Sequence, residues 1–300
     1  MKPVVGVIGL GIMGGAMAEA LLAAGWQVCG TDVKPQARQR LKRAGGRALA
    51  TSAAVARAAD IVIVSLATIR ALEAVSAEVA AAKPRKRPLI IETSTLPLVD
   101  KERAAALLAK AGMRTLDCPI SGTAVRMKEG AWTIFVSGEA AAARKAAPVL
   151  EVFTRKAPYV GAFGNGTRMK FIANHLVAIY NVAVGESITF ARKMGLDPQQ
   201  VWDLFAASPI IGNGVFRLRG KFMVDRKYLP ATMKVEVWQK DMQVIGDMAK
   251  SVDCPTPLFS ACVPIFNAAM AQGLSQHDTA SVCKVLDAMA GGTAKKKRRR

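Results

Sequence analysis

The chain has 300 residues, of which 51% are hydrophobic and 21% are charged, and its formal net charge is +20. This length and apolar content exclude a single small module and supply material for one or two hydrophobic cores. The odd number of cysteines, the lack of a C-x-x-C pair and the presence of only two histidines argue against a disulfide framework, a zinc knuckle and a histidine-rich metal site. Since residues 4–8 already form a strand-like run, we expect no targeting peptide and a cytoplasmic protein.

The first half of the chain alternates short β-rich runs with alanine-rich segments. Short β-rich runs predict strands at residues 4–8, 27–31, 61–66, 89–92, 113–117 and 132–137, and the continuous apolar runs at 61–66 and 89–92 are typical of strands that are covered on both faces. The alanine-rich stretches between them predict helices at residues 12–24, 69–82 and 98–111. Such alternation is typical of an α/β domain with a mostly parallel, doubly wound sheet.

A glycine motif of the form G-x-G-x-x-G lies between the first predicted strand and helix, and it comprises Gly9, Leu10, Gly11, Ile12, Met13 and Gly14. Gly9 permits a tight turn, Gly11 lets the backbone approach a pyrophosphate, and Gly14 lets helix and strand pack closely. Asp32, at the end of the second strand, is placed to accept hydrogen bonds from the adenosine ribose and to repel a 2′-phosphate. A Rossmann domain that binds NAD is therefore expected. NADP is the alternative, because Lys34 and Arg38 lie close to Asp32 in the sequence.

The pattern changes at the glycine-rich residues 161–166, beyond which no strand is predicted. Helices are predicted at residues 167–194, 198–207, 235–251 and 256–272 and from about residue 278. We therefore expect a Rossmann domain at residues 1–163, an all-helical domain at 164–292 and a disordered basic tail at 293–300.

Residues 172–190 form the most apolar long window and are long enough to raise the question of a membrane span. Asn174, His175, Asn181 and Glu186 lie inside this window, and each would be costly in lipid. We therefore predict a buried helix and no membrane association.

The last six residues, 295–300, carry six positive charges. This run can be a solubilising end or a site for nucleic acid or another polyanion. We favour the solubilising role, because charge alone indicates only non-specific binding.

Lys170 and Asn174 stand four residues apart on a predicted helix and so share one face, which is otherwise apolar at residues such as Phe171 and Val177. Burial in such surroundings lowers the pKa of a lysine and makes it a usable proton donor and acceptor near neutral pH. Taken by themselves, the two residues fit a surface lysine at a helix start better.

Four segments together form a more specific pattern. They are residues 9–18, the run Asp-Cys-Pro-Ile-Ser-Gly at 117–122, the run at 164–174 that contains Lys170 and Asn174, and Lys240 followed by Asp241. In this order, and over nearly the whole chain apart from the tail, the sequence resembles the 3-hydroxyisobutyrate dehydrogenase family. These β-hydroxyacid dehydrogenases are related to 6-phosphogluconate dehydrogenase.

The resemblance implies a hydride transfer between NAD and a small 3-hydroxy acid, which is interconverted with its semialdehyde or keto acid. Lys170 would be the general acid and base, and Asn174 would hold the substrate oxygen. Ser121 and the backbone amide of Gly122 would bind the carboxylate, with Thr123 beside it. Lys240 would contact the cofactor or the substrate. The nicotinamide end of the site would be lined by Leu66, Ala67, Ser94 and Thr95. A long helix would lead into a helical substrate or dimerisation domain of a homodimer or homotetramer.

Departures from the family pattern bear on the substrate. Thr123 replaces the second glycine of Ser-Gly-Gly, Ala67 replaces a proline, and Trp132 replaces a small or aliphatic residue. The candidate substrates are 3-hydroxyisobutyrate, glycerate with tartronate semialdehyde, and threonate, and residues 122–125 favour a sugar acid such as threonate.

Two other functions remain as alternatives. Imine reductases share this architecture but usually carry aspartate or tyrosine in place of Lys170. A non-catalytic protein could instead use the basic tail to associate with nucleic acid, but the retention of both Lys170 and Asn174 favours chemistry.

Overall fold

The computed structural model describes residues 2–122, 130 and 132–291 and divides the chain into two compact units, Met1–Lys170 and Phe171–Arg300. Thr123 and the basic tail therefore lie outside the described residues. Each unit has its own hydrophobic core.

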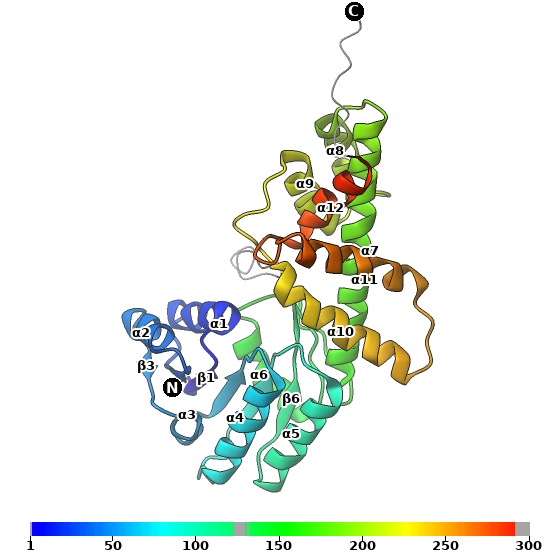
Figure 1. The fold of residues 1–300 in the computed structure, drawn as a ribbon. Coiled ribbons are helices and arrows are strands. Elements are labelled where there is room, and N and C mark those ends of the chain that lie inside the picture. The colour runs from blue at the N-terminus through cyan, green and yellow to red at the C-terminus, as the bar shows by residue number, and fades with distance from the viewer. Residues whose placement is uncertain (1, 123–129, 131, 292–300) are drawn as a thin grey trace, which may run out of the picture. The chain divides into compact units, whose positions relative to one another are not determined.

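A six-stranded parallel sheet forms the centre of the first unit (Figure 1). Its strands run in the order β3-β2-β1-β4-β5-β6. Strands β2 and β3 lie on one side of β1, and β4, β5 and β6 follow on its other side. The strand order therefore reverses between β1 and β4, and doubly wound folds bind ligands at such a switch point. The strands are β1 Val5–Ile8, β2 Val28–Thr31, β3 Arg47–Ala48, β4 Ile61–Val64, β5 Leu89–Glu92 and β6 Thr115–Asp117.

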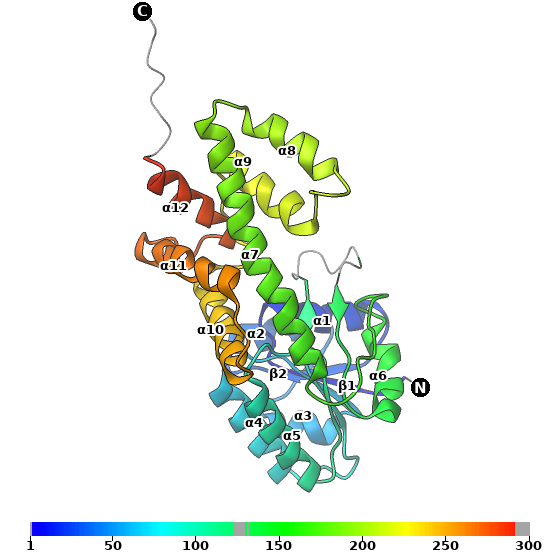
Figure 2. The same ribbon diagram turned by 90° about the vertical axis from the view of Figure 1, so that its right-hand side faces the viewer.

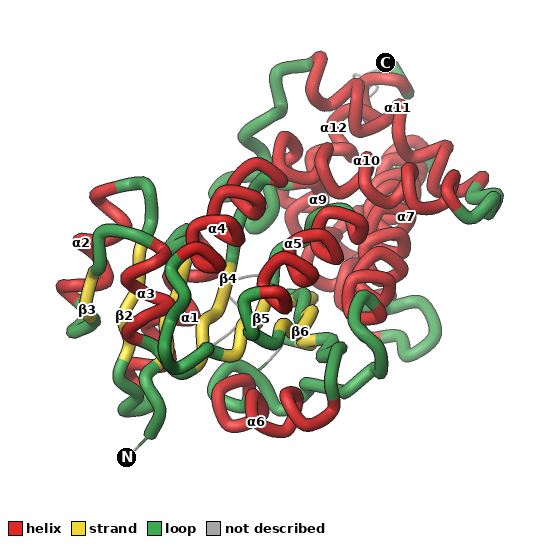
Figure 3. Tube along the Cα trace, turned by 90° about the horizontal axis from the view of Figure 1, so that it is seen from below, coloured by secondary structure: helices red, strands yellow, loops and turns green. Residues whose placement is uncertain are grey.

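Helices cover both faces of this sheet, because successive side chains of each strand point to opposite sides. Val5 and Val7 pack in a core cluster with helices α1 Ile12–Ala23, α2 Pro35–Arg43 and α6 Ala140–Leu150. Val62 and Val64 pack instead with α3 Ser52–Ala58, α4 Ile69–Ala81 and α5 Leu98–Lys110. Figure 3 shows α4 and α5 on one side of the strands and α6 on the other.

The predicted strands and helices of this unit are present, but several short elements were not predicted. Helices α2, α3 and α6 are missing from the sequence-based set, as are β3 and β7 Ile120–Ser121, which forms a small antiparallel sheet with β8 Thr133–Ile134. Helix α3 has only seven residues, and α6 contains Pro148, which obscures its helical pattern. The strand predicted at 132–137 is wrong in length: only β8 is regular, and Val136 and Ser137 form isolated bridges.

The second unit is helical throughout its described residues (Figure 2). Its elements are most of α7 Asn165–Lys193, then α8 Pro198–Ala207, a π-helical turn Phe216–Gly220, α9 Lys221–Asp225, α10 Val235–Ser251, α11 Pro257–Ala271, a 3₁₀ turn Thr279–Ser281 and α12 Val282–Met289. The π-helical turn and α9 were not predicted. The expected fold class, a Rossmann domain followed by a helical domain with a long helix, is confirmed.

Helix α7 is the one helix in the described part of the chain that is long and apolar enough to cross a membrane. Its side chains nevertheless supply the core of the second unit, including Phe171, Ala178 and Ile188. Buried Asn174 and Asn181 interrupt its apolar surface. These contacts are those of a core helix.

Candidate active site

The three glycines of the motif between β1 and α1 differ in what surrounds them. A Cβ on Gly9, where φ is +89°, would lie 2.2 Å from the carbonyl oxygen of Ser65, and one on Gly14 would lie 1.9 Å from that of Gly9. Both glycines are therefore required by the packing of the turn itself. A Cβ on Gly11 would meet nothing within 4 Å, so this position leaves open space beside the backbone, as the approach of a pyrophosphate requires.

Asp32 follows β2 and is held against the glycine turn. Its carboxylate accepts hydrogen bonds from the backbone amides of Leu10 at 2.7 Å and Lys34 at 2.8 Å. Large apolar side chains stand exposed beside it, Ile12 at 79% and Val33 at 91%. A fixed carboxylate, a helix N-terminus and exposed apolar surface together fit an adenine dinucleotide.

Basic side chains also lie at this end of the site. Arg38 donates to the carbonyl oxygen of Asp32, and Arg40 donates to that of Leu10 at 3.1 Å. Arg40 was not predicted, although it follows Arg38 at a spacing of two. The geometry therefore supports NAD(P) binding.

The carboxyl ends of β4 and β5 bring together two of the residues predicted at the nicotinamide end. The amide of Leu66 donates to Oγ of Ser94 at 2.8 Å, and the amide of Ser94 donates to Oε1 of Glu92 at 2.9 Å. Ser94 is buried, Thr95 is half-buried and Ala67 is exposed. The two strand ends are thus joined by a side-chain hydrogen bond.

The predicted carboxylate-binding segment ends in a tightly packed glycine. Gly122 has a φ of +147°, and a Cβ there would lie 2.5 Å from Cδ1 of Trp132, whose side chain is fully buried. Ser121 is half-buried in β7. Cys118 in the same segment is fully buried, and this burial, together with the charge of Asp117, raises the pKa of its thiol well above the ordinary range. These are the surroundings of a structural cysteine.

The first turn of α7 is capped by the end of β6. The amide of Thr167 donates to Oδ2 of Asp117 at 2.7 Å, its hydroxyl donates to Oδ1 at 2.8 Å, and the amide of Gly166 donates to Oγ of Ser137 at 2.9 Å. These bonds satisfy helix N-terminal amides that have no partner within the helix. Lys170 follows Thr167 by three residues and is buried, with 8% of its surface exposed.

Asn174 lies one turn further along α7, in the second unit, and is also buried. Its Nδ2 donates to Oδ2 of Asp241 at 2.9 Å, and Oδ1 of Asp241 lies 3.4 Å from Nζ of Lys240. Asp241 on α10 therefore orients the Asn174 amide and pairs with Lys240. The sequence pattern named Lys240 as the functional member of this pair and gave Asp241 no role.

Lys101 is the site residue that the sequence gave no reason to select. It lies in the first turn of α5, and its ammonium reaches Glu92, Ser94, Asp117 and Thr167. Three of these partners belong to other elements: Glu92 to β5, Asp117 to β6 and Thr167 to α7. Only the parallel register of β5 and β6, which pairs Glu92 with Asp117, brings the two carboxylates together.

Comparison with protein families assigns almost the whole described chain. Residues 4–161 match the NAD binding domain of 6-phosphogluconate dehydrogenase. Residues 164–286 match a domain described as NAD-binding of NADP-dependent 3-hydroxyisobutyrate dehydrogenase. The two matches meet within the glycine-rich segment at 161–166 and leave only the chain ends outside.

Individual relatives are similar over their full lengths. An L-threonate dehydrogenase of Cupriavidus necator is 32% identical over 94% of this chain and 95% of its own. A 2-hydroxy-3-oxopropionate reductase of Escherichia coli is 31% identical over 95% of this chain and 97% of its own. A crystal structure of a 3-hydroxyisobutyrate dehydrogenase from Salmonella typhimurium superposes with a TM-score of 0.84 at 28% identity, covering 95% of this chain and 100% of that one.

Proposed function

This chain belongs to the 3-hydroxyisobutyrate dehydrogenase family, the β-hydroxyacid dehydrogenases, and from that membership we propose that it oxidises a sugar acid of the threonate type with NAD. It is an NAD(P)-dependent enzyme that transfers a hydride between its cofactor and a small 3-hydroxy acid. The observation that carries the catalytic assignment is the buried pair on α7, Lys170 and Asn174, with the Asn174 amide held by Asp241.

In the proposed reaction, a nicotinamide held by the Rossmann domain would supply the hydride acceptor for the carbon that bears the reacting hydroxyl. Nζ of neutral Lys170 takes the hydroxyl proton, and in the reverse direction the ammonium returns it to the carbonyl oxygen. Asn174 holds the same oxygen through its amide, whose orientation Asp241 fixes. Lys240 is assigned to contact the cofactor or the substrate, and its ammonium group pairs with the carboxylate of Asp241.

The substrate carboxylate is assigned to Ser121 and the backbone amide of Gly122. No side chain can stand at Gly122, because Trp132 occupies the space a Cβ would need. Gly122 is itself exposed, as the approach of an anion to its backbone amide requires. Thr123, which follows in the sequence, supplies a hydroxyl where a glycine is usual in the family, and a hydroxyl suits a polyhydroxylated acid better than the methyl-substituted 3-hydroxyisobutyrate.

NAD is proposed over NADP because of Asp32. Its carboxylate is already fixed by two backbone amides, so it cannot easily turn away from a 2′-phosphate. Asp32→Ser removes this charge and leaves Arg38 and Arg40 nearby, so we expect the ratio of kcat/KM for NADP to that for NAD to rise. An unchanged ratio would show that Asp32 does not select the cofactor.

We also propose a homodimer or homotetramer in the cytoplasm. Exposed apolar side chains on α7, such as Ile172 at 62% and Phe190 at 63%, support self-association. So does an apolar groove of about 420 Å³ in the second unit, lined by residues such as Ile245, Met248 and Leu258. A reducing compartment suits the five cysteines, all of which are free thiols. Light scattering after gel filtration measures the oligomer size, and a monomer would contradict the proposal.

The central experiment is NADH formation from L-threonate, D-glycerate and 3-hydroxyisobutyrate by the wild type and by Lys170→Ala. Loss of the general acid and base should lower kcat by about 10²–10⁴-fold. Lys193→Ala is a matched control, because Lys193 lies on the same helix but is exposed and bonds only the carbonyl oxygen of Ala290 in the described structure. Equal activity of wild type and Lys170→Ala would remove Lys170 from the mechanism. A preference for 3-hydroxyisobutyrate would contradict the sugar-acid assignment.

A further inference from the structure

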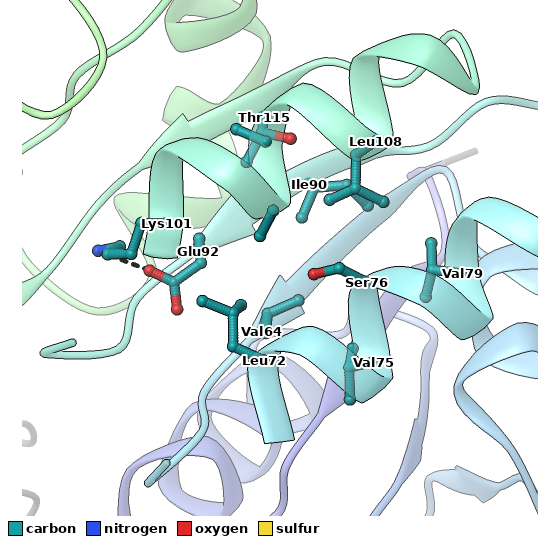
Figure 4. A pocket seen from close by; sticks show the side chains of 12 residues that line it. Val64, Leu72, Val75, Ser76, Val79, Ile90, Glu92, Lys101, Leu108 and Thr115 are labelled. Carbon is teal, nitrogen blue, oxygen red and sulfur yellow. Dashed lines mark ion pairs between the residues drawn. The ribbon is translucent and has the colours of Figure 1, made fainter. Parts of the chain in front are cut away.

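Lys101 is a charged residue with 1% of its surface exposed, an unusual place for an ammonium group. Its Nζ forms ion pairs with Oε2 of Glu92 at 2.6 Å and with Oδ1 of Asp117. It also donates to the carbonyl oxygen of Ser94 at 3.0 Å and to Oγ1 of Thr167 at 2.9 Å. Figure 4 shows Lys101 and Glu92 paired at one end of the small apolar cavity under α4 and α5.

The charge of Lys101 is maintained despite this burial. Burial by itself would lower the pKa of the ammonium group, but Glu92 and Asp117 raise it, and the net direction is upward. A buried ion pair contributes little stability compared with well-packed apolar residues of the same volume. The cluster is therefore better explained by the segments that it joins than by stability.

Those segments are the ones that the proposed function assigns to cofactor and catalysis. Through Ser94, Lys101 reaches the strand ends where the Leu66 amide is bound. Through Thr167 and Asp117 it reaches the capped first turn of α7, three residues before Lys170. One ammonium group thus bonds both the proposed nicotinamide end and the start of the helix that carries the proposed acid and base.

We propose that Lys101 is a positioning residue, which holds the first turn of α7 in register with the ends of β5 and β6 and so sets the place of Lys170 relative to the nicotinamide. This inference rests on the proposed function of Lys170. Misplacement of a reacting group by about 1 Å can lower the rate on the order of 100-fold. Loss of the link can therefore lower kcat although Lys101 does not contact the substrate.

The sharpest test is at Thr167, because Lys101 itself cannot be neutralised without leaving two buried carboxylates. Thr167→Val keeps the shape of the side chain and the backbone bond to Asp117 but removes the hydroxyl that accepts from Lys101 and donates to Oδ1 of Asp117. Thr167→Ser keeps the hydroxyl. Thr154→Val is a matched control, since it removes another buried threonine hydroxyl, which donates to the carbonyl oxygen of Trp132.

With L-threonate as the probe, we expect Thr167→Val to lower kcat by about 10- to 100-fold while the KM for NAD stays near that of wild type. Thr167→Ser should restore most of kcat, and Thr154→Val should retain it. A merely structural role would lower the folded fraction of the protein without this rescue or this separation of kcat from KM. A kcat for Thr167→Val equal to that for Thr154→Val would overturn the inference.

A second measurement does not depend on turnover. Amide hydrogen exchange in the peptide that covers residues 165–172 should be faster in Thr167→Val than in Thr167→Ser, because the hydroxyl link restrains the first turn. Equal exchange in the two variants overturns the inference even if the wild type is an active dehydrogenase. Absence of turnover by the wild type with every acid, together with the expected exchange difference, would instead reject the proposed function and retain the link between Lys101 and α7.

Discussion

The two units each contain a buried charged cluster, and the clusters differ in what they join. The Lys101 cluster of Glu92, Lys101, Asp117 and Thr167 has one cation between two carboxylates. In the second unit, the Arg219 cluster of Arg219, Thr232, Asp278 and Thr279 has one cation and one carboxylate, 2.7 Å apart.

Asp278 is the centre of the second cluster. Its oxygens accept from the amides of Thr232 at 2.8 Å, Met233 at 3.2 Å and Ala280 at 3.0 Å, as well as from Arg219. These bonds tie the π-helical turn and the 3₁₀ turn to the loop before α10, and none of those segments carries a proposed catalytic residue. The Arg219 cluster of the second unit therefore connects segments without a proposed catalytic residue. The Lys101 cluster of the first unit connects segments that belong to the proposed site.

The largest expected effect separates these two roles. Arg219→Met and Lys101→Met each leave carboxylate charge buried without its cation, so each should lower the free energy of unfolding by about 3–5 kcal/mol in urea titrations. Only Lys101→Met should also lower kcat per folded molecule. Arg226→Met, which loses a 3.4 Å pair from a half-exposed arginine to Asp287 and leaves Asp287 paired with Arg192, should change stability by less than about 1 kcal/mol. An equal loss of kcat in Arg219→Met would remove the distinction between the clusters.

The glycine motif offers the same contrast on a smaller scale. Gly14→Ala places a Cβ against the carbonyl oxygen of Gly9 and should cost about 1–3 kcal/mol of stability. Gly11→Ala meets no neighbour, so its stability should change by less than about 1 kcal/mol, while the Kd for NAD rises. Thermal unfolding and NADH fluorescence titration measure the two effects. A strongly destabilised Gly11→Ala protein would show that this glycine is needed for folding instead.

The two clusters should differ in how their contribution to stability depends on pH: one contribution is lost in acid and the other in alkali. Although burial opposes the charged form, Arg219 and the amide of Ala280 lower the pKa of Asp278. Its stabilising contribution is therefore present above the ordinary carboxyl pKa and is lost as the pH falls through the lower, folded-state pKa. The raised pKa of Lys101 has the opposite sign: its contribution is complete below the ordinary lysine pKa and is lost as the pH rises through the folded-state pKa.

Unfolding free energies measured across the pH range check these signs. Asp278→Asn should weaken the loss of stability in acid and leave the alkaline side as in wild type. Lys101→Met should weaken the loss in alkali and leave the contribution of Asp278 unchanged. The opposite assignment of acid and alkaline sensitivity would contradict the described ion pairs.

Sequence patterns predicted the elements that carry strong local signals. The apolar runs of β1, β4 and β5 and the helix of 10 residues at α8 were correctly bounded to within a residue or two because continuous apolar runs and helix caps are local properties. Helix α6 contains Pro148, which interrupts a helical pattern, and the π-helical turn contains the buried Arg219, whose partner Asp278 is 59 residues away in the sequence. The family pattern was confirmed, whereas the roles given to Lys170, Asn174, Ser121 and Lys240 stay predictions.

The sequence by itself determined the Rossmann fold, the NAD(P) motif, the family and the spacing that puts Lys170 and Asn174 on one face of α7, since each depends on residues close together in the chain. Only the tertiary structure decided that Gly11 faces open space while Gly14 is packed, that Asp241 holds Asn174, and that Lys101 joins the strand ends to the first turn of α7. The physical reason is the distance along the sequence between the residues that interact. Lys101 and Thr167 are 66 residues apart, and nothing local marks a buried cation whose partners are brought to it by the register of a sheet.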